Sequence, residues 1–65
     1  MDDVNTLKAR IKTLSARAMN LKLNLHDLAE DLPTGWEKIP EVAEQVFQAY
    51  RDLAQARSLL AAAGG

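Results

Sequence analysis

The chain has 65 residues, of which 48% are hydrophobic and 26% are charged, with a formal net charge of -1. This length allows one small domain, and the negative net charge argues against the general electrostatic attraction used by nucleic-acid binders. Cysteine is absent, which excludes disulfides, thiolate metal sites and thiol nucleophiles.

The first predicted element is a helix over about residues 3–32. Asp2 or Asp3 is suited to accept a hydrogen bond from a free N–H of its first turn. Pro33 lacks an N–H and disfavours a helical residue before it, so the helix should end at Leu32. Between these limits hydrophobic residues recur at alternating spacings of three and four, at Val4, Leu7, Ile11, Leu14, Ala18, Leu21, Leu25, Leu28 and Leu32.

A turn over residues 33–39 and a second helix over about residues 40–63 follow. Thr34 and Glu37 have capping-box spacing, but Pro40 suits a first-turn position, and we favour the start at Pro40. Gly64 and Gly65 end the helix. The same alternating spacing continues at Ile39, Val42, Val46, Ala49, Leu53, Ala56, Leu60 and Ala63. We call these two sets of positions the seam.

Two seams joined by a short turn predict an all-α fold, namely a coiled-coil-like antiparallel hairpin of two helices in one domain over residues 1–65. A hairpin alone buries one stripe per helix, and the second helix carries another stripe at Ala43, Phe47, Tyr50 and Ala54. We therefore expect hairpins to assemble into a four-helix bundle, as a homodimer or a tetramer. The expected interface residues are Leu14, Leu21, Leu28, Val46, Phe47, Tyr50 and Leu53.

Charge differs between the two ends of the predicted hairpin. Residues 1–22 contain five Lys or Arg and two Asp, whereas residues 23–48 contain six acidic residues and one Lys. An antiparallel pair of hairpins would place each acidic turn end on a basic open end, which favours that orientation. Exposed ion pairs contribute only about 0–1 kcal/mol each, and the alternative is that these residues are simply solvated.

One group of residues has the chemistry of a metal site. His26 and Glu30 are separated by one helical turn, with Asp27 beside them, so an imidazole and carboxylates could converge on a transition-metal ion. The alternative is a surface or interface histidine paired with a carboxylate. No nucleophile–base pair or phosphate-binding loop is present, so catalysis is not expected, and otherwise no cofactor is expected.

Three apolar residues lie off the seam, at Met19, Leu23 and Trp36. They could widen the core, with Trp36 covering the end of the bundle. Alternatively, they form a docking patch for another protein. The sequence leaves both possibilities open.

The stretch from Leu21 to Pro33, followed by Gly35-Trp36 and by Ile39 to Ala43, resembles the Rop-like family of short proteins encoded among nitrogen-fixation genes. The resemblance covers roughly residues 4–60. It implies a bundle-forming hairpin with an accessory role in nitrogen-fixing bacteria, and it does not carry over the RNA binding of the plasmid regulator that gives the family its name.

Three functions are therefore compared. The first is a non-enzymatic accessory protein of nitrogen fixation that binds itself and another protein, with a nitrogenase-assembly protein as the candidate partner. The second is a metal-binding or metal-delivery protein, and the third an RNA-binding bundle. The acidic start Met1-Asp2-Asp3 and the lack of a long apolar run predict a cytoplasmic protein without a membrane segment.

Overall fold

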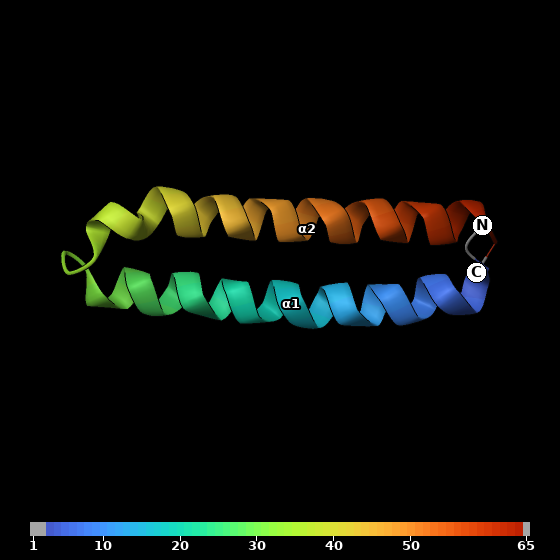
Figure 1. Cartoon of the computed structure of the whole chain (residues 1–65), viewed down its shortest axis with the longest axis horizontal. Helices are drawn as coiled ribbons and strands as arrows, with labels where there is room; N and C mark the ends of the chain where they lie inside the picture. The colour runs from blue at the N-terminus through green and yellow to red at the C-terminus, as the bar shows by residue number, and fades with distance from the viewer. Residues whose placement is uncertain (1–2, 65) are drawn as a thin grey trace.

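The computed structural model describes residues 3–64. In this range the chain forms helix α1 (Val4–Asp31), the short 3-10 helix η1 (Trp36–Lys38) and helix α2 (Ile39–Ala62). The two long helices run antiparallel and side by side, with the turn at one end and residues 4 and 62 at the other (Figure 1). The hairpin measures 46 × 15 × 15 Å. The architecture is the predicted all-α hairpin.

Helix α1 begins where its first free N–H groups meet a carboxylate. Oδ1 of Asp3 accepts a hydrogen bond of 2.7 Å from the backbone N–H of Thr6. This bond stabilises the charged carboxylate and lowers the pKa of Asp3 below 3.8. Asp2, the alternative cap, lies outside the described residues.

The end of α1 follows from the proline after it. Leu32 leaves the helical region, with φ -58° and ψ 143°, because Pro33 crowds a helical residue before it. The helix therefore spans Val4–Asp31, against about 3–32 expected from the sequence.

The turn is compact and hydrogen-bonded through its backbone. Gly35 has φ +78°, and Trp36 and Lys38 donate backbone hydrogen bonds to the carbonyls of Pro33 and Gly35. Gly35 and Lys38 are the cap residues of η1 and α2, and neither makes a side-chain cap bond. Within residues 3–64, the Thr34 side chain therefore caps neither helix, and the alternative start of the second helix with a capping box at Thr34 and Glu37 does not form.

Helix α2 begins at Ile39 with Pro40 in its first turn and ends at Ala62. Gly64 follows with φ +78°, a conformation that glycine adopts without strain. Gly65 lies outside the described residues.

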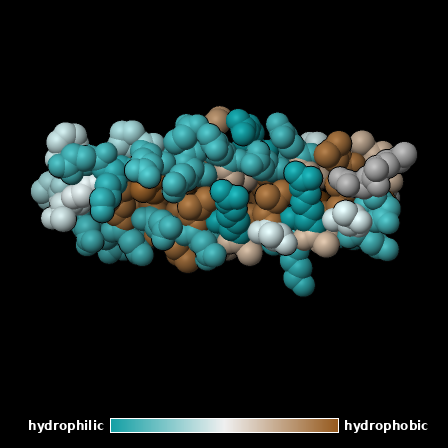
Figure 2. Space-filling model, viewed as in Figure 1, coloured by the Kyte–Doolittle hydropathy of each residue, from teal (hydrophilic) through white to brown (hydrophobic). Residues whose placement is uncertain are grey.

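The core consists of seam residues. Among residues 3–64, the five buried hydrophobic residues all belong to the seam, namely Leu7, Ala18, Ala49, Leu53 and Ala56. Ala18, Ala49 and Leu53 pack together near the middle of both helices. Figure 2 shows apolar side chains along the line between the helices, with hydrophilic side chains on both sides.

Polar contacts are confined to single helices. In the part of the chain that the structure describes, no side-chain hydrogen bond or ion pair joins α1 to α2. The two helices are therefore held together by apolar packing and by the turn. The search of residues 3–64 also finds no helix with enough length and apolar character to cross a membrane.

Candidate functional site

The histidine near the end of α1 lies between two carboxylates. Nε2 of His26 is 3.2 Å from Oε1 of Glu30, one turn further along. Nδ1 of His26 is 3.9 Å from Oδ1 of Asp27. All three side chains are at least 65% exposed, so water screens these pairs and their contribution to stability is small.

This geometry places the two carboxylates on different sides of the imidazole ring. Glu30 lies beside one ring nitrogen and Asp27 beside the other, and the two imidazole nitrogens point in diverging directions. A metal ion on Nε2 would have Glu30 as its second ligand but not Asp27. Within residues 3–64 no group of three His, Cys, Asp or Glu side chains could hold a metal ion. Within this range the three side chains therefore do not form a three-ligand site, and metal binding by His26 with one carboxylate stays a prediction.

The three residues of the expected docking patch are exposed but fall into two groups, because Met19 and Leu23 lie one helical turn apart on α1 whereas Trp36 lies in η1. Met19, Leu23 and Trp36 have exposed fractions of 52%, 51% and 61%. Leu23 lies about two turns before the end of α1, whereas Trp36 lies beyond the turn. Trp36 therefore belongs to a surface different from that of Met19.

The expected oligomer interface divides into three groups. Leu53 is buried inside the hairpin, with 3% of its surface exposed, so almost none of it is left for a second chain. Phe47 and Tyr50 are 62% and 40% exposed. The remaining four residues are half-buried along the seam, namely Leu14, Leu21, Leu28 and Val46.

Three exposed apolar residues share one face of the hairpin. Met19, Phe47 and Tyr50 each directly follow a seam residue. Because both helices are right-handed and run antiparallel, residues that directly follow the seam turn to the same side of the hairpin. Ala18 and Ala49 pack in one cluster near the middle of the helices, which places Met19 and Tyr50 at the same level. We call Met19, Phe47 and Tyr50 the mid-length patch.

The Lys, Arg, Asp and Glu residues that directly follow a seam residue are all basic. No Asp or Glu directly follows a seam residue, whereas four basic residues do, namely Lys8, Lys12, Lys22 and Arg57. Three of the four lie toward the open end of the hairpin. The face is therefore apolar at its centre and basic toward the open end.

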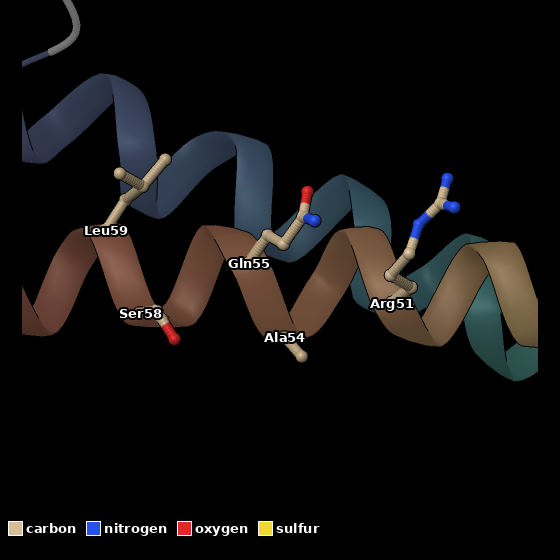
Figure 3. A pocket seen from close by; sticks show the side chains of 5 residues that line it. All are labelled: Arg51, Ala54, Gln55, Ser58 and Leu59. Atoms are coloured by element: carbon tan, nitrogen blue, oxygen red, sulfur yellow. The ribbon is translucent and has the colours of Figure 1, made fainter.

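A depression on the surface of α2 has few groups that could bind or react with a ligand. Its volume is about 540 Å³, and it is lined by Arg51, Ala54, Gln55, Ser58 and Leu59. All five side chains project from one helix, and they do not converge on a common point (Figure 3). Arg51 is the only ionisable residue among them. Leu59, at 57% exposure, is an apolar residue off the seam that the sequence reasoning missed.

Comparison with known proteins identifies the family of this hairpin. The family model described as Rop-like matches residues 2–64. The chain belongs to the Rop-like family. The resemblance noted in the segment around His26 and Pro33 is thus confirmed over nearly the whole chain.

Two relatives of this Rop-like chain carry the name UPF0437. A UPF0437 protein of Azorhizobium caulinodans is 53% identical over 60 residues, which cover 92% of this chain and 87% of that protein. A protein of Frankia alni is 46% identical over 52 residues, or 80% of this chain and 63% of the Frankia protein. Its name places it in the nifX-nifW intergenic region. The family is therefore linked to a nitrogen-fixation gene region through that member.

A solved structure has the same fold. A structural-genomics target determined by NMR superposes with a TM-score of 0.86 and 52% sequence identity, covering 95% of this chain and 87% of that chain. The two-helix hairpin is thus a Rop-like fold shared with an experimentally determined structure.

Proposed function

We propose that this Rop-like protein is a non-enzymatic accessory protein of nitrogen fixation that acts in the cytoplasm by binding other proteins as a homo-oligomeric bundle. The observation that carries the proposal is the exposed mid-length patch on a hairpin whose core is formed by other residues, those of the seam. Protein–protein contact is the use that such surfaces fit. The link to nitrogen fixation is supported by the gene region named for the Frankia relative.

The position of the mid-length patch supports self-association. The patch lies near the midpoint of α1 and α2, so two antiparallel hairpins would bring both patches together around a two-fold axis. The basic open end of each hairpin would then lie beside the acidic turn end of the other. The Rop-like family is known for dimeric hairpins. We therefore expect an antiparallel homodimer, which forms a four-helix bundle.

Sedimentation equilibrium tests the bundle. The wild type should sediment as a dimer at micromolar concentration, and Phe47→Ala with Tyr50→Ala should shift the equilibrium toward monomer. Leu59→Ala is the matched control, because Leu59 is equally exposed but directly precedes a seam residue and lies on the opposite face. A monomeric wild type would contradict the proposal, and so would equal effects of the two variants.

The role in nitrogen fixation needs a test in cells. Deletion of the gene should slow growth on dinitrogen and leave growth on ammonium unchanged. Affinity purification from nitrogen-fixing cells should retain a specific protein, for which a nitrogenase-assembly protein is the candidate. Normal growth of the deletion strain on dinitrogen, with no specific protein retained, would refute the proposed role.

A further inference from the structure

The hairpin seam ends in an exposed apolar surface at the turn. Leu32 is the last seam residue before the turn, and Ile39 is the first seam residue after it. These two residues are 41% and 37% exposed. Trp36, between them in the chain, is 61% exposed. In a longer coiled coil the next layer of the seam would cover such residues, but here the chain reverses. We call Leu32, Trp36 and Ile39 the turn-end patch.

The backbone of the turn is fixed before any partner binds. Gly35 holds the left-handed φ of +78°, and a Cβ there would lie 3.2 Å from Cδ1 of Leu28. The N–H of Thr34 donates to the carbonyl of Asp31 at 2.9 Å, and the turn continues directly into η1. A preordered turn loses little conformational entropy on binding, and tryptophan is among the residues that contribute most at protein interfaces.

Negative charge surrounds the turn-end patch. The exposed acidic residues of this end are Asp27, Glu30, Asp31, Glu37, Glu41 and Glu44. Lys38 is the only Lys or Arg between residues 23 and 48. In residues 3–64, no Lys or Arg lies within 4.0 Å of any of these six carboxylates. An anionic membrane or a nucleic acid would be repelled here, whereas a cationic surface would be attracted.

We propose that the turn end docks onto a protein surface that combines an apolar pocket with a rim of Lys and Arg, and that Trp36 is the anchor. This inference deepens the proposed function, since it names the surface used for a partner other than a second copy. The turn end lies at the extremity of the hairpin, away from the mid-length patch. None of the six acidic residues directly follows a seam residue, so they lie off the face that a homodimer built through that patch would share. Each hairpin of the dimer would thus keep its docking surface.

Trp36 is the only tryptophan, so its fluorescence reports directly on this surface. The probe is a synthetic amphipathic helical peptide of Leu and Lys, and the matched control is the same peptide with Glu in place of Lys. The Leu/Lys peptide should shift the Trp36 emission to shorter wavelength in a saturable manner that weakens with salt. Equal shifts with both peptides, or no shift with either, would overturn the proposal.

Variants separate the anchor from the charge. Measured with a labelled Leu/Lys peptide, Glu30→Gln with Asp31→Asn and Glu37→Gln should weaken binding about tenfold, since each exposed charge contributes only modestly to the attraction. Trp36→Ala should also weaken it, and Asp52→Asn, toward the other end of α2, should not. Circular dichroism checks that each variant is folded. Unchanged binding by folded Trp36→Ala would refute the anchor role.

The same variants distinguish this inference from the proposed function. A partner that is retained from nitrogen-fixing cells equally by wild type, Trp36→Ala and the charge variant would refute docking at the turn end and leave the function intact. Peptide binding as described, with normal growth of the deletion strain on dinitrogen, would refute the function and leave the docking surface intact.

Discussion

Replacing Leu53 with alanine tests whether the hairpin depends on its small apolar core. Leu53 is 3% exposed and packs against Ala18 and Ala49, whose side chains cannot extend to fill the space that a leucine leaves. Substitutions of buried leucine by alanine cost about 2–5 kcal/mol. A slender hairpin can relax partly around the cavity, so we expect a loss of about 2–3 kcal/mol.

This loss is large for such a chain. At about 0.05–0.15 kcal/mol per residue, a domain of 65 residues has a total stability of about 3–10 kcal/mol. A change of 1 kcal/mol shifts the Tm of a domain of this size by about 4–8 °C. The Tm of Leu53→Ala should therefore fall by about 10–20 °C, measured by circular dichroism at one fixed protein concentration because association stabilises oligomers.

Leu59→Ala is the matched control for helix propensity, since it makes the same chemical change in the same helix. Leu59 is 57% exposed, so its loss should cost less than about 1 kcal/mol. Equal destabilisation by the two variants would refute the assignment of Leu53 to the core. A larger effect at Leu59 would show that its face is buried by another chain.

Three further predictions concern the ends of the helices and the histidine. Asp3 has a lowered pKa in the folded chain, so its contribution to stability is present above pH 3.8 and is lost as the pH falls through the lower folded value. The variant Asp3→Asn keeps a cap residue but cannot ionise, so it should remove this pH dependence from acid unfolding curves. Gly35→Ala should lower the free energy of unfolding in urea by about 1–2 kcal/mol, because of the positive φ and the contact with Leu28. Gly64→Ala is the control, since Gly64 has the same φ but open space around it, and it should lower the free energy of unfolding less. Calorimetric titration with zinc should give the same result for wild type and His26→Ala. Micromolar zinc binding by the wild type that is lost in His26→Ala would refute this prediction.

Much of the fold could be predicted because helix packing follows a simple period. Every buried hydrophobic residue in the described part of the chain is a seam residue, since spacings of three and four keep one stripe of each helix facing the other. The start of α1 at Asp3 and its end before Pro33 were also predictable, because they depend on local hydrogen bonding and backbone sterics. The turn was harder, since the capping-box spacing of Thr34 and Glu37 fits a local pattern that the backbone does not adopt.

The arrangement of the candidate site residues could be predicted less well, because it depends on the directions of the side chains, which sequence spacing does not specify. The spacing of His26 and Glu30 gives their contact, but the side of the imidazole ring that Asp27 occupies depends on the rotamer. Met19 and Trp36 looked like one patch as apolar residues off the seam. They separate because one lies midway along a helix and the other beyond the turn.

The sequence by itself determined that this chain is a hairpin of two helices and which residues pack between them. Local sterics and a period of 3.5 residues are sufficient for that conclusion. Only the tertiary structure decided which apolar residues stay exposed and how they divide into a mid-length patch and a turn-end patch. Exposure depends on what lies opposite each side chain in space, and the antiparallel arrangement brings residues from distant parts of the chain to one face.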